Sequence, residues 1–341
     1  MSDAFEITRP LPGAQFGGIV SLKGGGDAHD LIAAAQAEPN FLLRALVESD
    51  GLLLIKGMDA ISDDPSLLVR LSEFFGPEVE DYRRTLTRAE AIHQGTPEIM
   101  LVQSIPPTSR KPPPLPDPPL TADGKIPVQY PHRRGWHTDQ SYRRPPPDAS
   151  LFYAVVPVPK GQGQTMFANG IAAYAALSPA QQARIKGVMG LHVQPGSGRS
   201  RDAVRAGDTP KLLAPHERSQ AQPLVRIHPV SGKPALYMCE YGQMDWLDGP
   251  IVGMEPGPDG EGGKLLDELM AHMTQRQFVY VHEWDPGDLV IWDNRCLVHA
   301  ATWFDAATHE RVMWRTTVHG NPGTLYAGQR KSWLREEIAA E

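Results

Sequence analysis

The sequence predicts a mainly β protein, a double-sheet jelly roll with helices packed outside it. Three observations support this prediction: many short apolar runs lie between turn-forming residues, helical patterns are few, and no internal repeat is present. The chain has 341 residues, of which 41% are hydrophobic, which is enough for a sizeable core. Because barrels with insertions often reach this length as one domain, we expect a single domain over residues 1–341.

The first third of the chain alternates between helical and strand patterns. Residues 28–48 are helical in pattern, although Pro39 is expected to split the helix. The apolar run between the glycines of residues 51–57 predicts a buried strand. An Asp-Pro pair opens a helix expected over residues 64–76, and a further strand is expected at residues 100–103.

The later elements follow from the same two signals, apolar periodicity and turn residues. In chain order we expect a strand at 149–156, helix at 169–186, a strand at 187–194, a hairpin at 225–238, a helix at 264–275, and strands at 289–292 and 311–318. The strand at 289–292 follows an Asp-Pro-Gly-Asp turn, in which proline presets φ and glycine accepts positive φ.

Proline dominates residues 105–131, which interrupt this pattern as an insertion. Such a segment cannot donate ladder hydrogen bonds and favours polyproline II or disorder. Because it ends at the motif described next, we expect a flap over the active site. A polyproline ligand for a partner of the SH3 kind is the alternative.

His137 and Asp139 are two residues apart, so on a strand both side chains would point to the same face. His299 stands 299 − 139 = 160 positions further on, where a distant strand could deliver it. Two histidines and one carboxylate can hold one face of an octahedral Fe(II) and leave the other face open. Because the chain has 12 histidines and 40 acidic residues, the pair alone also fits a structural cluster.

Arg311, Met313 and Arg315 share one face of the last predicted strand. A buried guanidinium without a partner is costly, so two arginines beside a core methionine indicate that the interior receives an anion. A carboxylate would suit the bidentate guanidinium fork.

The chain resembles the taurine dioxygenase and 2,4-dichlorophenoxyacetate dioxygenase (TauD/TfdA) family of Fe(II)/2-oxoglutarate enzymes. The resemblance covers residues 5–320, and its motifs fall in family order: residues 136–139, 161–165, 292–295 with His299, and 311–315. It favours the double-stranded β-helix, or cupin-like jelly roll, over other sandwiches.

The resemblance implies that His137, Asp139 and His299 bind Fe(II). It implies that Arg311 and Thr165 hold the distal carboxylate of the cosubstrate 2-oxoglutarate, which is used together with O2. The expected reaction hydroxylates an aliphatic C–H bond and releases succinate and CO2. Related halogenases carry a small residue in place of the carboxylate, so Asp139 favours oxygenation.

Substrate recognition is assigned by the same resemblance to Arg315 and Arg133, which indicate a small anionic substrate such as a carboxylate or sulfonate. For Arg315 the alternative is an ion pair with Asp293 or another acid. Taurine enzymes of this family have a histidine shortly after a Phe-Gly pair, but none stands in the residues that follow Phe75-Gly76 here, which argues against taurine. Glu80 and Asp81, which stand there instead, could meet an amine. A tailoring hydroxylase or desaturase for an amino acid or natural product therefore remains open, as does an inactive metal-binding jelly roll.

Composition bears on partners and location. The net charge of −7 argues against nucleic acid or an anionic membrane as the main partner. Neither a membrane-length apolar run nor a signal-like start is present, and Cys239 and Cys296 form no disulfide framework. We expect a cytoplasmic protein with reduced cysteines. Association into a homo-oligomer is left open.

Overall fold

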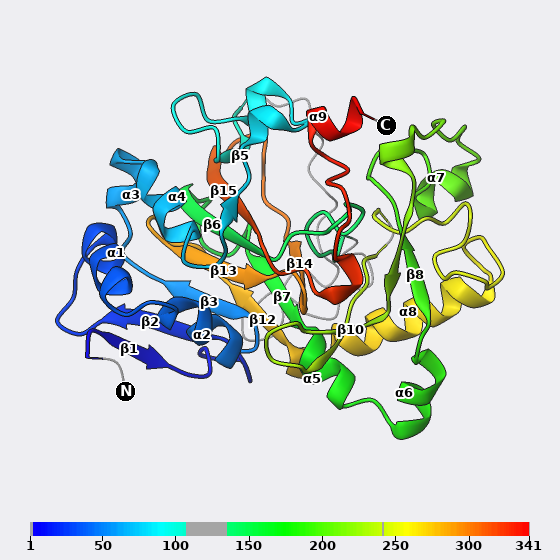
Figure 1. Cartoon of the computed structure of the whole chain (residues 1–341), viewed down its shortest axis with the longest axis horizontal. Coiled ribbons are helices and arrows are strands. Elements are labelled where there is room, and N and C mark those ends of the chain that lie inside the picture. The colour runs from blue at the N-terminus through cyan, green and yellow to red at the C-terminus, as the bar shows by residue number, and fades with distance from the viewer. Residues whose placement is uncertain (1–2, 107–134, 241, 341) are drawn as a thin grey trace.

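Strands dominate the centre of the structure and helices lie at its two sides (Figure 1). This computed structural model describes residues 3–106, 135–240 and 242–340. The strands are β1 (Phe5–Thr8), β2 (Gly18–Leu22), β3 (Leu52–Ile55), β4 (Glu78–Val79), β5 (Met100–Ser104), β6 (Ala149–Val156), β7 (Thr165–Asn169), β8 (Met189–His192), β9 (Gln220–Pro223), β10 (Val225–Ile227), β11 (Pro234–Leu236), β12 (Val279–His282), β13 (Leu289–Asp293), β14 (Leu297–Ala301) and β15 (Arg311–His319).

The helices include several single turns of 3-10 helix, labelled η. They are α1 (Ala28–Ala37), α2 (Phe41–Glu48), α3 (Ala60–Asp63), α4 (Ser66–Ser72), η1 (Tyr82–Arg84), η2 (Ala89–Ala91), α5 (Gly170–Ala175), α6 (Pro179–Ile185), α7 (Arg201–Ala206), η3 (Pro215–Glu217), α8 (Glu261–Met273), η4 (Arg276–Phe278), η5 (Thr324–Tyr326) and α9 (Arg335–Ile338).

The larger sheet has eight strands in the order β1-β2-β3-β13-β6-β15-β4, with β5 also paired to β15. Its central strands β13, β6 and β15 are antiparallel, and β2 and β3 form a parallel pair. A smaller sheet has the order β12-β7-β14. Both sheets therefore bring together strands that are far apart in the sequence.

The two sheets pack face to face through a shared apolar core. On the larger sheet Trp292 lies 6.0 Å from Phe152 between ring centroids, and across the interface it lies 5.5 Å from Phe167 of the smaller sheet. Along β13, Val290 and Trp292 face this core, whereas Leu289 and Ile291 face the opposite side. This period of two is what a strand buried on both faces requires.

Helices cover the outer face of each sheet (Figure 1). Leu31 of α1 and Leu46 of α2 belong to the same apolar cluster as Ile291 of the larger sheet. Leu269 of α8 packs in a second cluster with Val298 of the smaller sheet. The order of layers is thus helices, large sheet, small sheet and helices. Full burial of each such leucine stabilises the fold by about 1.5–3 kcal/mol.

The predicted elements are present, with shifts at their ends, except that the helix expected at residues 169–186 is divided into α5 and α6, and Ser178 is the N-cap of α6. The break at Pro39 between α1 and α2 is confirmed, as are the strand at residues 149–156 and the hairpin of β10 and β11. The helix expected to reach residue 76 ends at Ser72. Helix α8 begins three residues before the predicted start and includes Gly262 and Gly263, where a side chain would crowd Ile251 and Trp246.

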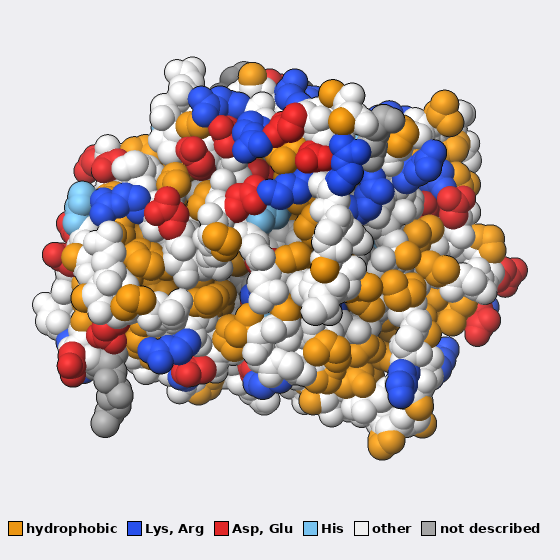
Figure 2. All heavy atoms as spheres, in the orientation of Figure 1, with side chains coloured by type: hydrophobic (Ala, Val, Ile, Leu, Met, Phe, Trp, Pro, Cys, Tyr) orange, Lys and Arg blue, Asp and Glu red, His pale blue; other side chains and the backbone are white. Residues whose placement is uncertain are grey.

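Charged side chains of both signs are interspersed on the face above β5 and α9 (Figure 2). Surface ion pairs join Arg84 to Glu336 and Arg330 to Glu337. In the part of the chain that the structure describes, no helix has the length and apolar character needed to cross a bilayer. Apart from residues 105 and 106, the proline-rich insertion and its predicted flap role lie outside the described residues.

Candidate active site

His137 and His299 come together through their backbones. The His137 amide donates to the His299 carbonyl at 2.9 Å, and the His299 amide donates back at 2.7 Å. The prediction of a regular strand at residues 137–139 was wrong: His137 forms an isolated bridge to β14 and Asp139 begins a turn. The reason is that the Asp139 amide donates to the Asn294 side chain at 3.2 Å instead of to a neighbouring strand.

The side chains of His137, Asp139 and His299 converge. Each imidazole Nε2 lies 3.9 Å from Asp139 Oδ1, and the three ligand atoms lie within 4.8 Å of one another. Metal bonds to nitrogen and oxygen ligands are about 2.0–2.2 Å long, so one ion fits between the three atoms. His137 Nδ1 is 2.6 Å from the Gly135 carbonyl; a proton on Nδ1 leaves Nε2 free to bind metal.

The protonation states suit a metal site, because metal ligands must be deprotonated. Burial lowers the pKa of His299 to about 3, so this imidazole is neutral at physiological pH. Burial alone would raise the pKa of Asp139, but Arg315 and the two histidines more than offset this and hold it at about 2. Asp139 is therefore a carboxylate in a buried position.

A chain of buried hydrogen bonds fixes the second oxygen of Asp139. Ser150 Oγ donates to Asp139 Oδ2 at 2.7 Å and accepts from Asn294 Nδ2 at 2.9 Å. Trp292 Nε1 donates to Asn294 Oδ1 at 2.9 Å. Such supporting bonds orient a ligand and are commonly as important as the ligand itself.

Arg315 reaches the same carboxylate from β15. Its Nη1 lies 2.8 Å from Asp139 Oδ1. The sequence left Arg315 open between substrate binding and an ion pair with Asp293 or another acid, and the structure pairs it with Asp139. Asp293 instead accepts from Arg295 and from His228.

The described residues hold a second candidate group of metal ligands, formed by His228, Asp293 and Cys296. Asp293 Oδ2 already accepts from His228 at 2.9 Å and from Arg295 at 2.6 Å. Burial also raises the pKa of the Cys296 thiol well above its usual value, so the sulfur stays protonated. This group is therefore a structural network, in which Cys296 is a buried core residue.

Arg311 is buried at the start of β15, and no carboxylate among the residues with described positions pairs with it. Its guanidinium lies 5.7 Å from the centre of the Phe152 ring and 5.8 Å from that of Phe304. Burial lowers the pKa of Arg311 to about 10, which still leaves it charged at neutral pH. An unpaired buried cation of this kind fits an anionic ligand.

Thr165 opens β7, and its hydroxyl accepts from Trp284 Nε1 at 3.0 Å. The Trp284 ring is 5.4 Å from the Phe152 ring, which also contacts Arg311. Phe152 and Trp284 thus lie between Arg311 and Thr165, the two residues expected to hold the distal carboxylate of 2-oxoglutarate. Arg311 therefore contacts Phe152 directly, whereas Thr165 is linked to Phe152 only through Trp284.

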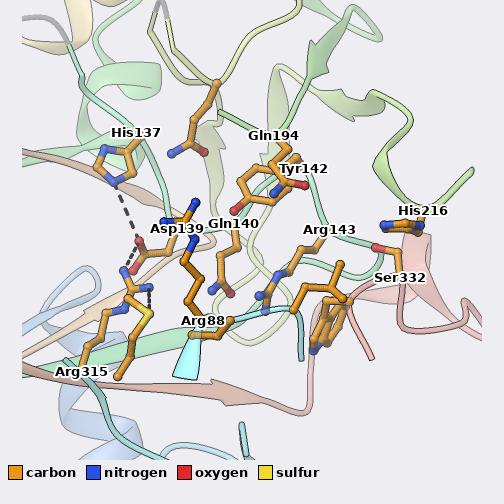
Figure 3. A pocket seen from close by; sticks show the side chains of 15 residues that line it. Arg88, His137, Asp139, Gln140, Tyr142, Arg143, Gln194, His216, Arg315 and Ser332 are labelled. Carbon is orange, nitrogen blue, oxygen red and sulfur yellow. Dashed lines mark hydrogen bonds and ion pairs between the residues drawn. The ribbon is translucent and has the colours of Figure 1, made fainter. Parts of the chain in front are cut away.

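A cavity of about 410 Å³ opens beside His137, Asp139 and Arg315 (Figure 3). This volume falls within the range of small-molecule pockets, about 300–1,000 Å³. His299, Arg311 and Thr165 do not line it. The other lining residues were missed at the sequence level: Leu86, Thr87, Arg88, Met100, Gln140, Tyr142, Arg143, Gln194, His216, Gln243, Ser332 and Trp333.

One of the predicted substrate residues with a described position is not found in this cavity. Asp81 does not line it, because its carboxylate caps η1 and pairs with Arg83 at 2.8 Å. The expected contact of Asp81 with an amine is therefore not supported. Arg133 lies outside the described residues.

Comparisons with known proteins agree with this geometry. Residues 8–317 match the family described as "Taurine catabolism dioxygenase TauD, TfdA family". An (S)-phenoxypropionate/alpha-ketoglutarate-dioxygenase of Sphingobium herbicidovorans is 34% identical over 193 residues, covering 56% of this chain and 63% of that enzyme. A pentalenolactone F synthase of Streptomyces avermitilis is 26% identical over 349 residues, covering 99% and 100%.

Among solved structures, AAD-2 in complex with Mn(II) and N-oxalylglycine is similar, with a TM-score of 0.64 and 25% identity, over 93% of this chain and 98% of that chain. The match to the Sphingobium enzyme spans less than two thirds of that enzyme's length. The match to the family, by contrast, covers nearly all of this chain, including both histidines, Asp139 and both arginines of β15. The chain belongs to the TauD/TfdA dioxygenase family.

Proposed function

We propose that this protein is an Fe(II)- and 2-oxoglutarate-dependent dioxygenase that hydroxylates an aliphatic C–H bond of a small anionic organic substrate. One observation supports this most strongly: two imidazoles and a carboxylate converge at the edge of a cavity lined by arginines. The named activities of the relatives, on phenoxypropionate, 2,4-dichlorophenoxyacetate and sulfate esters, point the same way.

In this proposal His137, Asp139 and His299 hold Fe(II), and Arg311 with Thr165 holds the distal carboxylate of 2-oxoglutarate. When bound, the metal and cosubstrate supply the oxidising chemistry with O2, with succinate and CO2 as products. The protein's own residues orient these groups. Ser150 and Arg315 fix Asp139, Trp284 fixes the Thr165 hydroxyl, and the aromatic side chains around Arg311 exclude water.

The packed sheets also support a double-stranded β-helix as the core, formed by one domain over the whole chain. A cytoplasmic location, the absence of nucleic-acid and membrane partners, and any homo-oligomer stay predictions. A tailoring hydroxylase or desaturase of a natural product is the second candidate, favoured by the full-length similarity to pentalenolactone F synthase. An inactive metal-binding jelly roll is the non-enzyme alternative.

The test combines binding with turnover. Anaerobic addition of Fe(II) and 2-oxoglutarate should produce a weak visible charge-transfer band, and air with a substrate panel should release succinate. The panel contains phenoxyalkanoates, sulfonates, sulfate esters and amino acids. His137→Ala and His299→Ala should remove both signals, whereas His29→Ala, a change at an exposed histidine, should retain them. Bound iron without the band would overturn the proposal.

A further inference from the structure

The cavity beside Asp139 is lined by three arginines, Arg88, Arg143 and Arg315, and by one carboxylate. Figure 3 shows Arg143, Ser332 and His216 on the side away from His137, with Arg88 and Gln140 between the two sides. The lining therefore carries an excess of positive charge, which suits the anionic substrate of the proposed function on which this inference rests.

Two of these arginines already have carboxylate partners. Arg315 Nη1 donates to Asp139 at 2.8 Å, and its Nη2 lies 3.6 Å from the sulfur of Met100. Arg143 Nη1 lies 2.9 and 2.7 Å from the two oxygens of Glu80, which is buried behind it. The guanidinium of each is thereby held in place and its charge is largely balanced.

Arg88 differs from its neighbours. It is exposed at the start of η2, and no hydrogen bond or ion pair of its side chain is found within residues 3–106, 135–240 and 242–340. On the same segment, Arg83 pairs with Asp81 at 2.8 Å and Arg84 pairs with Glu336. Arg88 is thus the cavity-lining arginine whose charge is not balanced by a described carboxylate.

Gln140 provides a second and independent indication of a ligand. The residue is 7% exposed and lines the cavity, and its Oε1 is buried without a hydrogen-bond partner among the described atoms. Its backbone has a φ of 53°, a left-handed conformation that is unusual outside glycine. A buried amide oxygen without a partner costs free energy, and a ligand with a hydrogen-bond donor would remove that cost.

We propose that Arg88 binds the anionic group of the substrate and that Gln140 makes a hydrogen bond to the substrate beside it. Arg315 then serves mainly to position Asp139, and selectivity for an anion resides in the segment that joins η1 and η2. The ligand class is a small organic carboxylate or sulfonate that also carries a hydrogen-bond donor, which Gln140 Oε1 would accept.

The experiment measures binding without turnover, in protein loaded with Mn(II) and N-oxalylglycine. The probes are two anions with neutral partners of similar shape, phenoxyacetate with phenoxyacetamide and butanesulfonate with butanesulfonamide. Calorimetry gives the Kd of each probe for the wild type, Arg88→Gln, Arg88→Lys, Gln140→Leu and the control Arg83→Gln. Arg83 is an arginine of the same segment that does not line the cavity.

We expect at least one anion to bind the wild type more tightly than its amide. Arg88→Gln should weaken that anion by about ten- to a hundred-fold, as expected for the loss of a charged hydrogen bond, and change the amide less than twofold. Arg88→Lys should retain part of the preference for the anion over its amide, and the control Arg83→Gln should retain all of it. Gln140→Leu should weaken the two amides, whose N–H groups can donate to Gln140 Oε1, and change the two anions, which carry no donor, less than twofold.

The inference is overturned if neither anion binds better than its amide, or if Arg88→Gln keeps the full preference. Its failure is distinguishable from failure of the proposed function, because the same titrations can be made without metal. If Mn(II) and N-oxalylglycine do not bind, the proposed function fails, while the preference of the metal-free protein still tests Arg88.

Discussion

Arg315 Nη1 lies 2.8 Å from Asp139 Oδ1, the same oxygen that faces both imidazoles at 3.9 Å. The carboxylate therefore has one guanidinium as a fixed partner and one open direction toward the histidines. Burial alone would lower the pKa of Arg315, but Asp139 more than offsets this and raises it. A bound metal ion and Arg315 would thus both stabilise the negative charge of the buried Asp139 carboxylate.

Arg315→Gln should make the metal-free protein much less stable but the metal-bound protein only slightly so. Without Arg315, the buried carboxylate of Asp139 loses its charge partner, a change that typically costs about 3–5 kcal/mol. A bound Mn(II) ion supplies positive charge opposite the same oxygen. Thermal unfolding with and without Mn(II) should show a larger metal-induced rise in Tm for the variant than for the wild type. An equal metal-induced rise in Tm for Arg315→Gln and the wild type would contradict this coupling. So would a larger rise in Arg83→Gln, the control in which an exposed ion pair is removed.

Arg311→Met should weaken 2-oxoglutarate binding while leaving the fold intact. Arg311 has no carboxylate partner in the described part of the chain, so its removal leaves no buried charge behind. Loss of one partner of a buried charge pair typically costs 2–5 kcal/mol, so the KM for 2-oxoglutarate should rise by at least about thirty-fold. Steady-state succinate release gives the KM, and thermal unfolding gives the stability. A normal KM would remove Arg311 from the cosubstrate site.

Thr165→Val should destabilise the protein through Trp284. The Thr165 hydroxyl accepts from Trp284 Nε1 at 3.0 Å, and both residues are buried. The variant leaves the indole N–H without a partner, at a cost of about 1–3 kcal/mol in the free energy of unfolding. Replacing the donor as well, in Thr165→Val with Trp284→Phe, should recover part of the loss. Denaturant unfolding of the two single variants and the double variant measures this coupling.

Glu80 should contribute stability that depends on pH. Burial alone would raise its pKa, but Arg143 and His319 lower it from 4.5 to about 2. Because the folded-state value is the lower one, the contribution is fully present above about pH 4.5 and is lost as the pH falls toward 2. Glu80→Gln should therefore be destabilised at neutral pH by about 3–5 kcal/mol, since Arg143 loses its buried partner.

The measurement is urea unfolding of both proteins between pH 7 and pH 3. The difference in free energy of unfolding should shrink as the pH falls below about 4.5. Glu78→Gln, at a partly exposed position on β4, is the control and should show a much smaller difference. A difference that stays constant with pH would mean that Glu80 is not ionised in the folded protein.

Much of the fold could be predicted because its signals are local. The apolar run of β13, which is buried throughout, that of β6, which is buried over most of its length, and the break between α1 and α2 at Pro39 depend on residues close in sequence. The element ends were less predictable. The glycines at the start of α8 are typical of a loop in sequence, yet they are helical, and their close approach to Ile251 and Trp246 is visible only in the structure.

The candidate metal ligands were also visible in the sequence, because His137, Asp139 and His299 belong to motifs of recognisable type and order. Arg311 was visible as an arginine on the apolar face of a predicted strand. Arg88 and His216 gave no such signal, because a single polar residue in an irregular segment has the same pattern whether it faces solvent or a cavity.

The sequence by itself determined which residue types are available and which of them share a face, since strand periodicity encodes that information directly. Only the tertiary structure decided their partners. Arg315 pairs with Asp139, and Arg143 pairs with Glu80, across 176 and 63 positions of sequence. Ion pairing depends on the distance between atoms in space, and periodicity cannot say which of 33 basic residues meets which of 40 acidic ones. The same reasoning applies to Arg88. Only the structure shows that Arg143 and Arg315 of the cavity have carboxylate partners, whereas Arg88 has none among the described residues.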